Sequence, residues 1–177
     1  MDVIGRRAAP VCDAGPVRFG FEQRWEAAAD DVLAVYIDAD FWSSLGGLTK
    51  TSAPTVLDVS RTGDTALVRL RYVLNVELPS QAARFIDPDD VAWVEETTWT
   101  LTTRTATVRF LPEQAAGLMK ASATADLQAD GVDTTREVRG ELRVRIPLVG
   151  GKVEHAIVEG IGGHLEEEAD AVANRLA

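Results

Sequence analysis

Glu95 is the side chain whose surroundings could best support acid–base chemistry. It shares the parity of a predicted strand with Trp93 and Trp99, so the carboxylate points inward if the two tryptophans do. A carboxyl group in an apolar cavity has a raised pKa and can act as an acid or a base. Because strand glutamates are usually exposed or paired with an arginine, we favour such a structural role and keep catalysis by Glu95 as the alternative.

Two histidine–glutamate pairs are candidate metal ligands. His155 with Glu159 and His164 with Glu168 are each spaced i, i+4, which places each pair on one face of a helix. A zinc site normally needs three or four converging ligands, whereas these two histidines are the only ones in the chain. We therefore interpret both pairs as solvent-exposed helix pairs, and we expect no metal and no other cofactor.

The patterns of nucleophilic and nucleotide sites are incomplete in this sequence. Cys12, the single cysteine, lies in the predicted leader, and the sequence contains no Gly-x-Ser-x-Gly elbow. The stretch 150–152 (Gly-Gly-Lys) lacks the first glycine and the hydroxyl residue of a phosphate-binding loop, since Ile146 and Val153 occupy those places. These glycines are predicted to ease a turn from strand to helix.

The charge balance bears on possible partners. The chain carries 28 acidic and 18 basic residues, for a formal net charge of -10. A nucleic-acid interface would need a basic stripe, but the basic residues on some predicted strands have acidic residues interleaved among them. These residues are Arg136, Arg139, Arg143 and Arg145, with Glu137 and Glu141. This pattern predicts a solvated sheet face and no nucleic-acid partner, and the acidic balance argues against adhesion to anionic lipid.

Composition also bears on compartment and domain number. Hydrophobic residues make up 46% of the chain, the balance of a globular protein with a sizeable core. No segment approaches the roughly 18 consecutive apolar residues that span a bilayer. One cysteine suits a reducing compartment. We expect a cytoplasmic protein without an integral membrane segment, with residues 1–16 as a flexible lead-in and residues 17–177 as one domain.

Periodicity predicts the elements that position these residues. Period-two alternation predicts a first strand at 17–25 and six later strands, whereas three-to-four spacing predicts helices. The later strands are expected near 55–61, 66–76, 91–101, 106–110, 119–128 and 138–146, and the helices at 26–37, 38–47 and 150–176. Tight turns between consecutive strands imply antiparallel pairing, and helices gathered at the two ends indicate an α+β fold. The prediction is a curved antiparallel sheet of about seven strands around a long C-terminal helix, with two short helices after the first strand.

This order of elements resembles the START-like, or helix-grip (SRPBCC), superfamily. That superfamily includes lipid-transfer domains, pollen-allergen relatives and polyketide aromatase/cyclases, and the resemblance runs from about Val17 to Leu176. The stretch 140–154 (GELRVRIPLVGGKVE) is similar to the strand-to-helix junction of an actinobacterial family of unknown function within it. The resemblance implies a cavity between sheet and helix for an apolar or amphipathic ligand, and it brings no catalytic residues.

We therefore hypothesise a non-catalytic binder of a small hydrophobic ligand, such as a lipid. The side chains expected to line its cavity are Tyr72, Trp93, Trp99, Phe110, Met119, Ile157 and Ile161. One alternative is an enzyme like the aromatase/cyclases that uses Glu95. Another is a protein-interaction module that uses the acidic helix 150–176 or the loop 78–90.

Overall fold

The structure, a computed structural model, describes residues 15–74, 91–114, 117–148 and 150–177. Across these ranges, seven strands form one antiparallel sheet in the order β1-β7-β6-β5-β4-β3-β2. The strands are β1 (Val17–Trp25), β2 (Thr55–Thr62), β3 (Thr65–Val73), β4 (Ala92–Thr100), β5 (Thr105–Pro112), β6 (Met119–Asp130) and β7 (Asp133–Val144). The predicted α+β helix-grip fold is confirmed. The loop 78–90 and most of the lead-in 1–16 lie outside the described residues.

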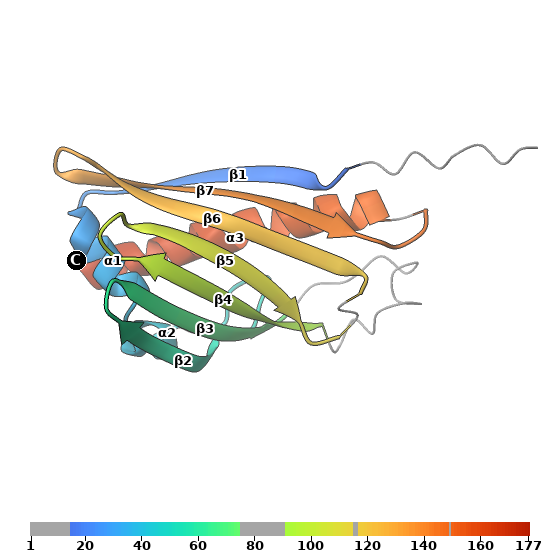
Figure 1. Ribbon diagram of the computed structural model, residues 1–177, viewed down its shortest axis with the longest axis horizontal. Helices are drawn as coiled ribbons and strands as arrows, with labels where there is room; N and C mark the ends of the chain where they lie inside the picture. Colours follow the sequence, from blue (N-terminus) through green and yellow to red (C-terminus); the bar gives the residue numbers. More distant parts are fainter. Residues whose placement is uncertain (1–14, 75–90, 115–116, 149) are drawn as a thin grey trace, which may run out of the picture.

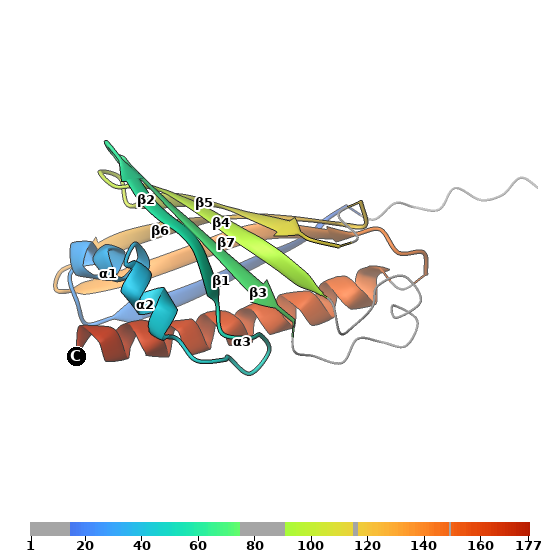
Figure 2. The ribbon, with the colours of Figure 1, turned by 90° about the horizontal axis from the view of Figure 1, so that it is seen from below.

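Three helices complete the described part of the chain. Helices α1 (Ala29–Tyr36) and α2 (Ala39–Ser44) follow β1, and α3 (Gly150–Leu176) follows β7. Both short helices are shorter than predicted, and α1 starts three residues late because Ala28, its N-cap, still has an extended backbone. Figures 1 and 2 show α3 running beneath the curved sheet, with α1 and α2 beside its C-terminal end.

Strand alternation decides which side chains face α3. The burial of β3 alternates along its length, with Ala66, Val68, Leu70 and Tyr72 as the buried set. Tight turns join the strands at Gly63 and Gly131, whose backbones are left-handed at φ 58° and φ 65°. Glycine adopts this conformation without the steric cost that a side chain brings. These turns bring β3 back beside β2 and β7 back beside β6.

An aromatic cluster fills the end of the molecule near α1 and α2. Its members are buried: Trp25, Tyr36, Phe41, Trp42 and Trp99. The ring of Tyr36 lies 6.1 Å from that of Trp25 and 5.9 Å from that of Trp99. Two indole N–H groups of this cluster donate to backbone carbonyls. That of Trp25 donates to Ala169, and that of Trp42 donates to Tyr36. This end of the fold is therefore a packed core.

Two glycines permit close packing on the inner face. A Cβ atom at Gly140 of β7 would lie 2.7 Å from the backbone oxygen of Ser122, and one at Gly162 of α3 would lie 2.8 Å from the Phe21 ring. Both distances are shorter than real Cβ contacts. Gly162 therefore lets α3 lie directly on β1.

Replacing Gly140 by alanine should lower the free energy of unfolding by about 2 kcal/mol, because the neighbouring backbone cannot move aside without strain. Gly163→Ala is the matched control. Its Cβ would meet nothing within 4 Å, so the better helix propensity of alanine should raise the free energy by up to about 1 kcal/mol. Urea denaturation of both variants measures the two effects, and equal destabilisation would contradict the packing argument.

Candidate functional site

The inner face of the sheet is covered unevenly. Away from the aromatic cluster, several apolar side chains of the sheet and of α3 are only half-buried although they pack against the core. These are Trp93, Phe110, Met119 and Ala121 from the sheet, with Ile157 and Ile161 from α3. Phe110 and Ala121 are register partners on neighbouring strands. The region, which we call the open inner surface, offers accessible apolar area on both the sheet and the helix.

Two of the seven predicted ligand residues lie outside the open inner surface. Trp99 is 1% exposed and belongs to the aromatic cluster. Tyr72 is also 1% exposed, and its ring stacks on Trp93 with centroids 5.6 Å apart. Tyr72 is therefore a buried residue that packs against Trp93 and is not itself accessible. The indole nitrogen of Trp93 is itself buried and has no hydrogen-bond partner in the described part of the chain.

Glu95 lies on the inner face, next to the open inner surface. Its register partners are Leu70 and Phe110, and it is half-buried. Burial, followed by repulsion from the carboxylate of Glu168, raises its pKa from the ordinary 4.5 to about 7. A long hydrogen bond from the Thr97 hydroxyl, at 3.4 Å, opposes this rise only weakly. The expectation of an exposed strand glutamate is therefore wrong, and near neutral pH this carboxyl group can hold or release a proton.

A buried arginine lies deeper under the sheet. Nη1 of Arg136 donates to Glu168 Oε1 at 2.5 Å, to the Tyr36 hydroxyl oxygen at 2.7 Å and to Gln23 Oε1 at 3.1 Å. Its guanidinium carbon also lies 4.3 Å from the centroid of the Tyr36 ring. The side chains of Arg136 and Glu168 are only 7% and 3% exposed, so this is a buried ion pair.

The assignment of Arg136 to a solvated sheet face is wrong. Its neighbours Arg139 and Arg145 are exposed, as predicted, but position 136 has the parity of the inward residues Val138 and Gly140. The parity of β7 contained this signal, and the charges interleaved along the strand obscured it. Gln23 faces Arg136 across the strand pair and also donates to the Leu165 carbonyl, so its side-chain amide is held by the core.

His164 extends the buried network along α3. Its Nε2 lies 3.7 Å from Glu168 Oε2, its Nδ1 lies 3.4 Å from the Thr51 hydroxyl, and its ring meets the Tyr72 ring edge-on at 5.2 Å. Burial lowers its pKa, so the imidazole is neutral near pH 7. The prediction of a solvent-exposed pair is thus wrong for His164 and Glu168.

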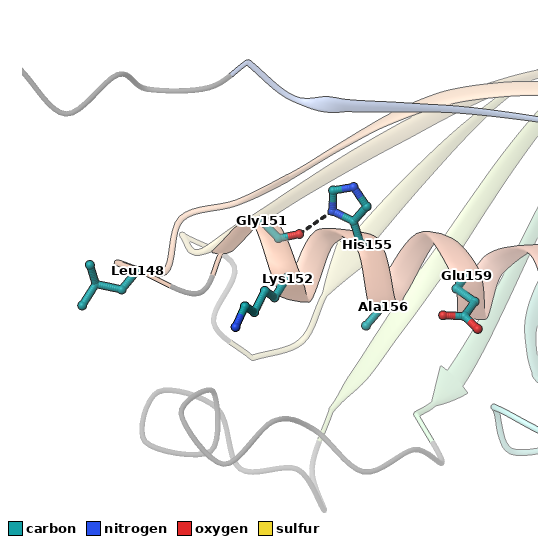
Figure 3. A pocket seen from close by; sticks show the side chains of 6 residues that line it. All are labelled: Leu148, Gly151, Lys152, His155, Ala156 and Glu159. Carbon is teal, nitrogen blue, oxygen red and sulfur yellow. Dashed lines mark hydrogen bonds between the residues drawn. The ribbon is translucent and has the colours of Figure 1, made fainter.

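The other predicted helix pair lies on the outer face of α3. His155 and Glu159 are both exposed, as predicted, and His155 Nδ1 lies 2.7 Å from the Gly151 carbonyl oxygen. They border an open hollow of about 620 Å³ along the first turns of α3 (Figure 3). Leu148, Gly151, Lys152 and Ala156 complete its lining. All six lining residues belong to α3 or to the connection before it, and none of them belongs to the open inner surface.

The interior therefore contains two kinds of polar group. Arg136 and Glu168 neutralise each other, and their hydrogen bonds to Tyr36 and Gln23 hold them in the core. Glu95 is different, because the one hydrogen bond described for it is long and because it borders accessible apolar surface. Of these groups, Glu95 is the one that a bound molecule could reach.

Several solved structures share the fold of this chain. A START superfamily protein from Mycobacterium smegmatis matches with a TM-score of 0.55 and 14% identity, over 91% of this chain and 97% of that one. The Zhui aromatase/cyclase from Streptomyces sp. R1128 matches with a TM-score of 0.58 and 16% identity, over 91% and 93%. Norcoclaurine synthase from Thalictrum flavum, in complex with dopamine and hydroxybenzaldehyde, matches with a TM-score of 0.54 and 17% identity, over 99% and 96%.

Residues 21–176 match the model of a family described as "Protein of unknown function (DUF2505)", and the chain belongs to that family. A comparison with curated proteins found no match. In the part of the chain that the structure describes, no helix is both long and apolar enough to cross a membrane.

Proposed function

We propose that this protein binds a small apolar or amphipathic molecule between the open inner surface of the sheet and α3. The observation that carries the proposal is that Trp93, Phe110 and Met119 of the sheet and Ile157 and Ile161 of α3 pack against the core while keeping accessible area. In a closed core such side chains would bury that area against one another. A ligand that covers them gains the same hydrophobic stabilisation.

The carboxyl group at this surface fits an amphipathic ligand. Glu95 can donate a hydrogen bond when protonated and accept one when ionised. Two relatives in fold also support small, partly aromatic ligands, since one is an aromatase/cyclase and the other is recorded with dopamine and hydroxybenzaldehyde. We leave Trp99 out of the proposed site because the aromatic cluster already surrounds it.

Enlarging Ala121 should weaken binding. Native mass spectrometry of the purified protein with a mixture of fatty acids and small aromatic compounds should detect a retained ligand. Ala121→Leu puts a larger side chain beside Phe110, and we expect about tenfold weaker binding of the retained compound.

Ser122→Leu is the matched control, because Ser122 is the next residue of β6 and its side chain faces outward. It should leave the affinity unchanged. If no compound is retained, or if both substitutions weaken binding equally, the proposal fails.

A second candidate is an acid–base enzyme that acts on the bound molecule, favoured by the position and the raised pKa of Glu95. Glu95→Gln keeps the shape and the hydrogen-bonding capacity of the side chain but removes proton transfer. For an enzyme, this variant should bind the retained compound and convert none of it. For a carrier, the compound released from the unaltered protein and from Glu95→Gln should be chemically unchanged in both cases.

A further inference from the structure

Leu148 is an apolar side chain in an unusual conformation and position. It lies between β7 and α3, is fully exposed, and has a left-handed backbone with φ 67°. A residue with a branched side chain is disfavoured there, and a small polar or glycine residue would fit better. Figure 3 shows the Leu148 side chain projecting away from the first turn of α3. Neither local conformation nor packing accounts for a leucine at this position.

Basic side chains surround this exposed leucine. Arg145 precedes it and Lys152 follows it in the first turn of α3, and both are exposed. Lys120, also exposed, is the register partner of Arg143 at the same end of the sheet. The first turn of α3 contains no acidic residue, and Glu154 just beyond it is buried, with its carboxylate accepting from the backbone N–H of Val144.

The acidic side chains nearest to this end are few among the described residues. Glu141 is exposed and lies opposite Arg18 in the register, and Glu159 borders the hollow two turns along α3. Glu113, at the end of β5, forms an ion pair with Arg71. Within the described part of the chain, the acidic excess therefore does not extend to the neighbours of Leu148.

The opposite end of the sheet provides a natural contrast. Val132, in the β6–β7 turn, is also an exposed apolar side chain, but its neighbours are Asp130 and Asp133. Figure 1 shows this turn at one end of the molecule and the β7–α3 connection at the other. Although the net charge of the chain is -10, described basic residues thus gather at the end that carries Leu148, whereas Asp130 and Asp133 flank Val132 at the other end.

We propose that the β7–α3 tip docks on the surface of an anionic lipid membrane, with Leu148 inserted among the lipids and Arg145, Lys152 and Lys120 facing the headgroups. An exposed apolar residue within a basic surround combines the two attractions that hold peripheral proteins on such membranes. Docking removes the Leu148 side chain from water, which no described contact within the protein does. The proposal does not depend on whether the inner surface holds a ligand.

Co-sedimentation with vesicles of phosphatidylcholine and phosphatidylglycerol in equal parts tests the proposal. The protein should bind these vesicles, bind pure phosphatidylcholine vesicles more weakly, and dissociate as salt is added. Leu148→Asn should weaken binding about tenfold, since asparagine suits the left-handed backbone but loses the apolar contact. Lys152→Gln should weaken it about fivefold.

Val132→Asn is the matched control and should bind as the unaltered protein does. Leu148→Gly, whose backbone adopts this conformation freely, is a second variant that should unfold at an unchanged or higher temperature while losing vesicle binding. The proposal is overturned if the unaltered protein does not sediment with the anionic vesicles, if neutral vesicles bind it equally well, or if Val132→Asn has the same effect as Leu148→Asn.

Discussion

Replacing Arg136 by methionine should lower the free energy of unfolding by about 3–5 kcal/mol, as expected when one partner of a buried ion pair is removed. The substitution leaves the Glu168 carboxylate without its counterion in a site where that side chain is 3% exposed. Gln23 and Tyr36 also lose the donor that they share. Urea denaturation followed by tryptophan fluorescence measures the change.

Two further variants separate the ion pair from simple packing. Arg139 lies on the outer face of the same strand, where its side chain is 69% exposed, so Arg139→Met should change the free energy of unfolding by no more than about 0.5 kcal/mol. The double substitution Arg136→Met and Glu168→Met should be less destabilising than Arg136→Met alone, because no unpaired charge stays buried. A double variant whose loss equals the sum of the single losses would contradict this account.

Glu95→Gln should stabilise the protein above neutral pH and should do so much less near pH ~5. Because the folded-state pKa of Glu95 is raised, folding favours its protonated form. Stability is therefore greatest below the unfolded-state pKa of 4.5 and falls as the pH rises through about 7. The difference between these two pKa values corresponds to at most about 3 kcal/mol, and the partial exposure of Glu95 reduces this to about 2 kcal/mol.

The measurement is the free energy of unfolding of both proteins at several pH values from about 5 to about 8.5, with the difference as the readout. Glu96→Gln is the control, because Glu96 faces outward on the same strand and pairs with Arg69 and Arg109. Removing that carboxylate loses surface ion pairs and should bring no gain at high pH. If Glu95→Gln gives the same difference at every pH, Glu95 does not ionise in a buried site.

The fold could be predicted because its periodic patterns are long and consistent. Strict alternation from Val17 to Trp25 and from Met119 to Leu127, together with the apolar stripe of 150–176, permits few other arrangements. The same alternation placed Trp93 and Phe110 on the inner face. The pattern of apolar and polar residues therefore predicts most of the architecture.

The buried network could be predicted only in part. The positions were readable, since Arg136 has the inward parity of β7 and Glu168 lies on the stripe of Leu165 and Val172. What the pattern could not supply was the pairing, because an arginine from β7 meets a glutamate from α3 only after the sheet curves over the helix. Without its partner Glu168, Arg136 on an inward position is therefore predicted to be exposed.

Which apolar residues keep accessible area could not be predicted either. Trp93 and Trp99 lie on the same face of one strand, yet one borders the open inner surface and the other is enclosed by Tyr36. The difference arises from where α1, α2 and α3 cover the sheet. The accessible area of each tryptophan thus depends on the position of the helices and not on the pattern of β4.

The pairing of the first strand with the last has a consequence for how the chain reaches its native state. Gln23 and Arg136 are 113 positions apart and Tyr36 and Arg136 are 100 positions apart, and among the described strands β1 hydrogen-bonds only to β7. During synthesis β1 must therefore wait, without its strand partner, until most of the polypeptide has left the ribosome. Forming such long-range contacts is entropically costly and slows folding. Until β7 is available, the nascent protein must therefore keep β1 from aggregating with other chains.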